Sequence, residues 1–331
     1  MKKTAISALL SLVLLAGQPA AAWAQELAVG GQIVGIQLRT RGVMVAGVSP
    51  VPTAEGRRSP ASEAGVRTGD FIIELGGAPV ESASGLIDAV GALDGAAAEL
   101  TLLRDGKEKR VTVQPALSQE NQWMLGMWLR DGITGIGTVT FCDPSTGRFG
   151  ALGHSVRDEE SGQLLPLRGG TISEAEIVDV VPGTAGAPGE LSGCSDAGRV
   201  LGQVEQNTEH GIFGHANGSL IGSRLVETGE LMPGPATILS TVSGHETREY
   251  RAQIGRLYRE GGTRRAVITV TDPELRERTG GIVQGMSGSP ILQNGKLVGA
   301  VTHVFVSDPS RGYAISIQDM LDDAAVEDMA A

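Results

Sequence analysis

The chain has 331 residues, enough for two domains of ordinary size, each with its own hydrophobic core. Its formal net charge is −11, and this acidic balance excludes the extended basic surface that nucleic-acid-binding and anionic-membrane-binding proteins use. Glycine is abundant, with 48 residues, while aromatic residues make up only 3% of the chain. Small residues, turns and aliphatic strands therefore dominate, and the composition favours a mainly β architecture.

Residues 1–24 have the pattern of an export segment. The chain begins with a methionine and two lysines, residues 5–16 form an apolar run that is short for a transmembrane helix, and Ala22 and Ala24 place small residues at a cleavage site. We predict an exported, extracytoplasmic protein. The segment is either removed as a signal peptide or retained as a membrane anchor, and an uncleaved buried helix is the remaining alternative.

The chain has two cysteines, Cys142 and Cys194. Outside the cytosol such a pair can form one disulfide, but two free thiols fit the sequence equally well.

Residues 26–115 read as one compact module. Alternating aliphatic residues predict strands over 34–38 and 42–48, and the spacing of Leu86, Val90 and Leu93 predicts a helix. Between them, residues 59–77 combine a short helix ending in Ala-Gly, a Gly-Asp turn and an apolar strand closed by two glycines. This segment resembles a PDZ domain of the bacterial-protease type.

A PDZ domain binds an extended peptide as an added strand and captures its terminal carboxylate with backbone N–H groups. The resemblance implies a carboxylate-binding loop at Ile33, Val34, Gly35 and Ile36, and a groove completed by the helix that carries Leu86 and Val90. For the two helix residues taken singly, a role in the core is the simpler interpretation.

Residues 116–122 read as a linker, and residues 123–331 as a second domain. Short aliphatic runs divided by glycine, proline and polar turns fill this part of the chain. They predict an antiparallel barrel or a pair of barrels, and helix is expected only near the C-terminus, over 316–329.

The segment from Thr279 to Ile291 carries the clearest chemical signal. Ser287 lies between Gly285 and Gly288, which let the backbone turn sharply, expose a hydroxyl and aim neighbouring N–H groups at one point. The pattern Gly-x-Ser-Gly-x-Pro resembles the nucleophile loop of chymotrypsin-like serine peptidases. We predict that Ser287 is the nucleophile and that the N–H groups of Gly285 and Ser287 form an oxyanion hole.

A serine nucleophile needs a base, and His154 is the best candidate among the five histidines. It directly follows a small-residue strand, as the catalytic histidine of chymotrypsin-like enzymes does. His303 lies within a strand after the nucleophile loop, where a structural or substrate-pocket role is the better interpretation. No pair of histidines has metal-ligand spacing with a supporting carboxylate, so we expect no metal and no cofactor.

The base needs an orienting acid, for which we choose Asp272, at the end of a predicted strand. Chymotrypsin-like enzymes take this acid from further upstream, so Asp179 and Asp196 are alternatives. Asp272 also precedes Pro273, and it could simply cap a helix.

The combined pattern resembles the SpoIVB (stage IV sporulation protein B) peptidase family. The pattern begins with an export segment and a PDZ domain. It continues with the run 149–154 ending in His154, the run 271–273 around Asp272, the run 279–290 around Ser287, and the run 294–306. The resemblance implies a serine endopeptidase of sporulating bacteria whose catalytic residues fall on His154, Asp272 and Ser287.

The family's role, as the resemblance implies it, is to cleave the extracytoplasmic part of a membrane regulator between the mother-cell and forespore membranes. This cleavage releases an intramembrane protease that activates a late sporulation sigma factor. The PDZ domain then binds a peptide, either from a partner or from the chain itself during self-processing. Two alternatives stay open: a non-catalytic PDZ-based scaffold, and a general envelope quality-control protease, in which the PDZ domain normally follows the catalytic domain.

Overall fold

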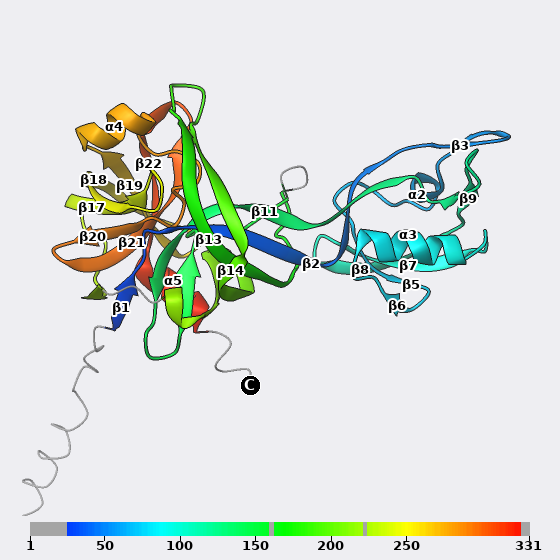
Figure 1. Ribbon diagram of the computed structural model, residues 1–331, viewed down its shortest axis with the longest axis horizontal. Helices are drawn as coiled ribbons and strands as arrows, with labels where there is room; N and C mark the ends of the chain where they lie inside the picture. Colours follow the sequence, from blue (N-terminus) through cyan, green and yellow to red (C-terminus); the bar gives the residue numbers. More distant parts are fainter. Residues whose placement is uncertain (1–24, 159–161, 221–223, 326–331) are drawn as a thin grey trace, which may run out of the picture.

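The computed structural model describes residues 25–158, 162–220 and 224–325. Figure 1 shows two parts, with the PDZ module at one end and a pair of β-barrels at the other, joined by two long strands. The predicted export segment, residues 1–24, lies outside the described residues. Within the described part of the chain, no helix combines the length and the apolar composition needed to cross a membrane.

The first barrel is a closed ring of six antiparallel strands in the order β2-β11-β12-β15-β14-β13, with β13 pairing back to β2. The small strands β1 and β16 extend its edge beside β11. The strands are β1 (Glu26–Val29), β2 (Ile33–Val48), β11 (Met127–Cys142), β12 (Arg148–Ala151), β13 (Leu167–Val181), β14 (Glu190–Thr208), β15 (Gly211–Ala216) and β16 (Leu225–Glu227).

The second barrel repeats this topology. Its closed ring runs β17-β18-β19-β22-β21-β20, so in both barrels the strands are arranged as first, second, third, sixth, fifth and fourth. The strands are β17 (Gly234–Thr241), β18 (Thr247–Glu260), β19 (Thr263–Val270), β20 (Pro290–Gln293), β21 (Lys296–Phe305) and β22 (Asp308–Ser316). The prediction of a mainly β, chymotrypsin-like barrel domain is confirmed, and of the two predicted forms, one barrel or a pair, the structure has the pair.

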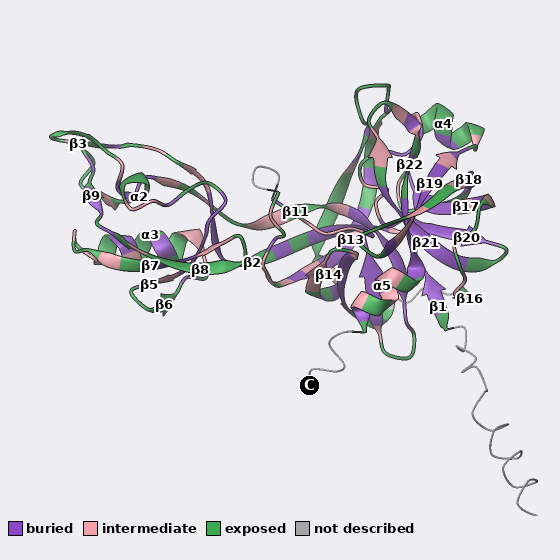
Figure 2. Cartoon of the chain, turned by 180° about the vertical axis from the view of Figure 1, so that it is seen from behind, coloured by how far each residue is buried: buried purple, intermediate pink, exposed green. Residues whose placement is uncertain are grey.

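Buried residues gather inside the two barrels (Figure 2). Period-two alternation explains this, because every second side chain of a strand points to the inside of its barrel. Beyond the strands, the barrel part has a short 3-10 helix, Gly218–Leu220, and the helices α4 (Pro273–Thr279) and α5 (Ile317–Ala324). Ile317 and Met320 of α5 pack with Leu27 of β1 and Phe213 of β15, so the C-terminal helix seals the seam between the barrels.

The PDZ module has its own core, built around Ile72, Leu86, Val90, Leu100 and Leu102. Beneath it, the carboxylate of Asp70, almost fully buried, pairs with Arg104 at 2.6 Å. The elements are the second half of β2 with β3 (Val51–Thr53), β4 (Gly56–Arg58), α2 (Pro60–Glu63), β5 (Phe71–Leu75), β6 (Ala78–Pro79), α3 (Ala83–Ala92), β7 (Ala98–Arg104), β8 (Lys107–Val113), β9 (Ala116–Leu117) and β10 (Trp123–Met124).

The strand pairing corrects the predicted boundary at residue 26. β1 pairs with β11, and residues 34–38 of β2 pair on one edge with β11 and on the other with β13. These residues are therefore strands of the peptidase barrel, and the PDZ module is inserted between the first and second strands of that barrel. The segment predicted as a linker, 116–122, contains β9, which pairs with β10 inside the PDZ module.

We therefore expect that a chain starting at residue 41 does not fold its first barrel. It would lose six apolar side chains that are at most 7% exposed, each worth about 1.5–3 kcal/mol, which is comparable to the total stability of a domain. They are Leu27, Val29, Ile33, Val34, Ile36 and Leu38.

Urea unfolding followed by circular dichroism tests this expectation, with the chain starting at residue 25 as the control. The PDZ transition is expected to survive the truncation and the barrel transition to disappear. A barrel transition with an unchanged midpoint would contradict the insertion.

Candidate active site

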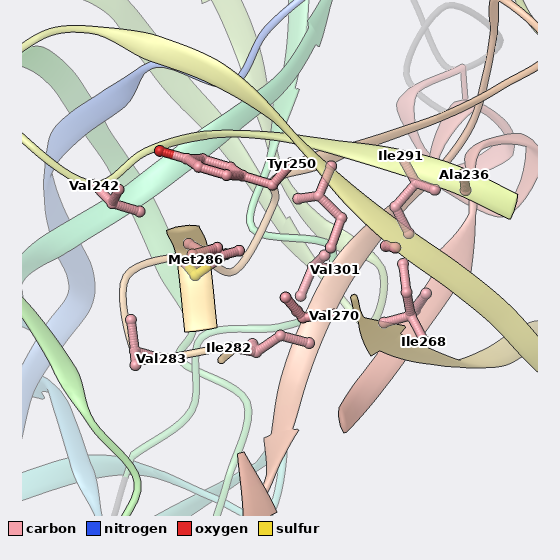
Figure 3. Close-up of a cluster of buried hydrophobic side chains, with 14 of the residues drawn as sticks. Ala236, Val242, Tyr250, Ile268, Val270, Ile282, Val283, Met286, Ile291 and Val301 are labelled. Carbon is pink, nitrogen blue, oxygen red and sulfur yellow. The ribbon is translucent and has the colours of Figure 1, made fainter. Parts of the chain in front are cut away.

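The loop that carries Ser287 is anchored in the second barrel by its neighbour, Met286. The Met286 side chain is fully buried and lies among Tyr250, Val283 and Val301 in the core of this barrel (Figure 3). Gly285 and Gly288 on either side have φ angles of +96° and +93°, which L-residues with side chains rarely adopt. The predicted sharp turn around the serine is present.

The same loop is tied to the first barrel through Thr138 and Thr140 of β11. The Thr138 N–H donates to the carbonyl of Ser287 at 3.1 Å, and its hydroxyl donates to the carbonyl of Gly285 at 2.9 Å. The Thr140 hydroxyl donates to the carbonyl of Gly288 at 2.8 Å. A Cβ at position 288 would lie 2.1 Å from the Thr138 carbonyl oxygen, so only glycine fits this approach. The Ser287 loop thus lies at the interface between the barrels.

His154 reaches the same place from the end of β12. Leu152, two residues before it, donates its N–H to the Thr138 carbonyl at 3.2 Å. Leu152 and Gly153 then turn the chain with φ angles of +70° and +71°. One residue of β11, Thr138, therefore holds both the segment that leads to His154 and the loop that carries Ser287.

The imidazole of His154 is half-buried and has a fixed orientation. Its Nδ1 lies 2.9 Å from the carbonyl oxygen of Ser155, which can only accept, so Nδ1 carries the proton and Nε2 is free to take another. Its ring centroid lies 4.4 Å from that of His303. Burial lowers the pKa of His154, and the positive charge of Arg265 lowers it further against the effect of the Ser155 hydrogen bond.

His303, on β21, lies against the other side of the site. Burial, with smaller contributions from His154 and Arg265, lowers the pKa of His303 to about 4, so its ring is neutral at pH 7. The residue before it, Thr302, accepts a 2.6 Å hydrogen bond from the Ser287 hydroxyl at its carbonyl. Ser287, Thr302, His303 and His154 thus form one contiguous cluster.

Two backbone N–H groups at this cluster have no acceptor among the residues that the structure describes, those of Gly285 and Ser287. The neighbouring groups are occupied: the Met286 N–H donates to Val283 and the Gly288 N–H donates to Val301. Two unpaired N–H donors in one glycine-flanked loop can bind the oxyanion that develops on a carbonyl under attack.

Asp272 does not contact His154 in the structure. It is the N-cap of α4: Oδ1 accepts from the N–H groups of Glu274 and Leu275, and Oδ2 accepts from the N–H and Nε of Arg251. Although burial opposes ionisation, these hydrogen bonds lower the pKa of Asp272. These contacts therefore match the interpretation of Asp272 as a helix cap, and not as the acid that orients His154.

The strand register shows how far Asp272 lies from the end of β21 that carries His303. Ile268 pairs with Gly312, and Gly312 pairs with Val304, so Ile268 lies level with the end of β21 that carries His303. Asp272 is four residues further along, or about 13 Å at the rise of a β-strand. The two alternative acids, Asp179 and Asp196, are exposed on β13 and β14, where Asp196 bonds the N–H of Gly198.

The sequence did not indicate the groups that hold the segment around His154. One is the Ser155 carbonyl, which no side-chain pattern reveals. Another is Asn207, whose amide accepts from the Val156 N–H and donates to the Val156 carbonyl, both at 2.8 Å. Asn207 lies on β14, just before the turn into β15, and its position beside residue 156 depends on the closure of the barrel.

The predicted carboxylate-binding loop is wrong. Ile33, Val34, Gly35 and Ile36 are strand residues of the first barrel. All four pair with β11, and Val34, Gly35 and Ile36 pair with β13 on the other edge, so their N–H groups face neighbouring strands. A Cβ at Gly35 would lie 2.3 Å from the Cβ of Ser195, which explains the glycine by packing.

The candidate PDZ groove is instead a cavity between α3 and the segment 121–129. A cavity of about 560 Å³ there is lined by Leu86 and Val90, as predicted for the helix side, and by Leu125, Gly126 and Met127 on the strand side. Gly126 has a φ of +74°. The aliphatic-glycine-aliphatic pattern at 125–127 is the same signal that was assigned to 34–36.

No cluster of His, Cys, Asp and Glu side chains that could hold a metal ion occurs in the described ranges of the chain. Both cysteines are free thiols, Cys142 buried and Cys194 exposed. Burial and the neighbouring Asp143 raise the pKa of Cys142 to about 11, so this thiol stays protonated at neutral pH.

Comparisons with known proteins identify the same two kinds of domain, with bounds that differ from the strand pairing at residues 34–38 and 121–127. Residues 121–321 match the family model of the SpoIVB peptidase S55, and residues 34–114 match that of the PDZ domain. The chain is 31% identical over 131 residues to a probable periplasmic serine endoprotease, DegP-like, of Pseudomonas fluorescens. That match covers 38% of this chain and 25% of the relative, so the chain spans about a quarter of the relative's length.

Similar solved structures include the Rv3671c protease of M. tuberculosis in its active form, with a TM-score of 0.35, 14% identity and coverage of 59% of this chain and 74% of that one. The PDZ domain of the SdrC-like protein of Listeria monocytogenes aligns with a TM-score of 0.22, 20% identity and coverage of 27% and 87%. Because the peptidase model matches more than half of the residues, this chain belongs to the SpoIVB peptidase S55 family, and it carries a PDZ domain.

Proposed function

We propose that Ser287 attacks the scissile carbonyl of a peptide and that His154 takes its proton at Nε2. The observation that supports this most is the arrangement around Thr138, which brings a tautomer-fixed imidazole and a glycine-flanked serine to one interface. Rotation of the Ser287 side chain moves its hydroxyl from the Thr302 carbonyl toward His154. The N–H groups of Gly285 and Ser287 then stabilise the tetrahedral oxyanion.

In this proposal the Ser155 carbonyl takes the orienting role that a carboxylate has in other serine peptidases. A carbonyl can hold the Nδ1–H and select the tautomer, and burial keeps the imidazole neutral and ready to accept a proton. Asp272 contributes to stability through α4 and not to proton transfer.

The substrate in this proposal is an exported protein. The resemblance to sporulation peptidases suggests the extracytoplasmic domain of a membrane regulator, whose cleavage releases an intramembrane protease and activates a late sigma factor. The PDZ groove binds an apolar C-terminal peptide of that target, or of the chain itself during self-processing, and presents the cleavage site to Ser287.

The role of Asp272 is tested by a pair of substitutions. Asp272→Asn keeps an N-cap side chain and we expect kcat/KM within about tenfold of wild type. Asp272→Ala loses the cap and is expected to cost about 1 kcal/mol in the free energy of unfolding. A drop of about 10⁴ in kcat for Asp272→Asn at unchanged stability would show that the carboxylate orients His154.

The lowered pKa of His154 has a consequence for the pH profile. Only the unprotonated imidazole can act as base, so we expect the acidic limb of kcat/KM to lie below pH 6.5, the ordinary value for histidine. Arg265→Gln removes a positive charge that disfavours the imidazolium, and we expect it to move the limb to higher pH. Rates measured between pH 4 and 8 check both statements. A wild-type limb above pH 6.5 would contradict the first, and an Arg265→Gln limb at or below the wild-type pH would contradict the second.

The PDZ proposal is tested with two synthetic substrates that share one cleavage sequence. One of them is extended by a Gly/Ser linker and an apolar C-terminus with a free carboxylate. We expect a lower KM for the extended peptide, through an added affinity on the order of micromolar, and no gain when its C-terminus is amidated.

The substitution Gly91→Glu places a charged side chain in the groove, where an added Cβ meets no atom within 4 Å. We expect it to abolish the gain of the extended peptide. Ala92→Glu, on the same helix but outside the groove lining, is the matched control. If Gly91→Glu kept the full gain, or if the two peptides had equal KM values on the wild type, the groove would not recruit substrate.

A further inference from the structure

A second cavity, of about 900 Å³, opens on the outer face of the second barrel directly beside the catalytic cluster. His303 belongs to its lining, and the ring of His303 contacts that of His154. Arg265, also in the lining, is close enough to lower the pKa of His154. The cavity therefore begins one side chain away from the proposed base.

Three aromatic rings form one wall of this cavity. Tyr313 contacts Phe305 at a centroid distance of 4.4 Å and Tyr258 at 6.5 Å. They come from three different strands, β18, β21 and β22, so the wall is part of the barrel framework and is present before any ligand binds. Aromatic residues make up only 3% of the chain, which makes this grouping notable for a surface outside the core.

Three arginines line the same cavity. Arg265 pairs with Glu260 at 3.0 Å. Arg256 and Arg311 instead lie over rings, 5.9 Å from the centroid of Tyr258 and 5.0 Å from that of Phe305. Neither of these two has a carboxylate within 4.0 Å in the part of the chain that the structure describes. A guanidinium stacked on an aromatic face keeps its edge free to bind a planar acceptor such as a carboxylate.

This concentration of unpaired positive charge contrasts with the net charge of −11 of the whole chain. A free guanidinium edge next to a peptidase base is complementary to an acidic side chain of the peptide being cut. We propose that the cavity is a specificity subsite that binds a Glu or Asp side chain of the substrate through Arg256 and Arg311, with the aromatic wall packing on its methylene groups.

The position of the subsite limits which residue of the substrate can place its side chain there. The cavity starts at His303, and an extended peptide advances about 3.3 Å per residue. The acidic residue is therefore expected on one side of the scissile bond, within about two to four residues of it. This inference rests on Ser287 being the nucleophile of the proposed reaction.

The test uses a library of peptides capped at both ends, so that only side-chain carboxylates are charged. The wild type is expected to prefer Glu over Gln about tenfold in kcat/KM at one position within four residues of the cut. We expect the double variant Arg256→Gln, Arg311→Gln to reduce this Glu/Gln ratio to about twofold or less. Because each enzyme is assayed on both peptides, the ratio does not depend on the fraction of folded protein.

Arg259→Gln is the matched control. Arg259 is exposed on the same strand as Arg256, bonds the carbonyl of Gly262 and does not line the cavity, so we expect the wild-type ratio to persist. A wild type that cuts peptides without an acidic preference, or a preference that survives the double variant, would overturn the subsite. A wild type that neither cuts peptides nor reacts with a small fluorophosphonate would overturn the proposed mechanism, and the subsite with it.

Discussion

The antiparallel pairing of β2 with β11 is the constraint on which the rest of the molecule depends. Their ladder runs from Val48 and Met127 in the PDZ module to Ile33 and Thr138 in the first barrel. The two strands close the barrel and join it to the PDZ module (Figure 1), and their ladder ends at Thr138, which holds the segments of His154 and Ser287. A peptide in the groove at 125–127 would therefore touch the same strand that, about ten residues later, supports Ser287.

The candidate active site is assembled from contacts between the barrels, each of which is geometrically specific. Thr138 satisfies three groups of two different segments, and the glycine at 288 permits a backbone approach that any side chain would block. Met286 adds apolar burial on the other side of the loop. Together these contacts hold the loop in a conformation with positive φ angles that would be unfavourable for the isolated segment.

The sequence predicted those local backbone features that depend on only a few consecutive residues. The sharp turn around Ser287, which has glycines on both sides and a proline soon after, could be predicted, and so could the strand end before His154. At both places the local backbone demands particular residues. Asp272 was assigned to His154 from its place at a predicted strand end and from the resemblance, but its contacts lie with α4, because the place of an acid depends on how distant strands stack in the barrel. Likewise, an aliphatic strand containing glycine occurs at both 34–36 and 125–127, and only the pairing partners show which one borders the groove.

The central claim is that Ser287, activated by His154 without a carboxylate partner, is the nucleophile. It is tested most directly by mass-spectrometric mapping of the adduct that a fluorophosphonate forms with the purified protein. We expect one adduct, on Ser287, whose rate of formation falls by several orders of magnitude in His154→Ala and stays near wild type in Asp272→Asn. An adduct on Ser289, whose fully buried hydroxyl donates to Ser240, or labelling that persists in His154→Ala, would contradict it.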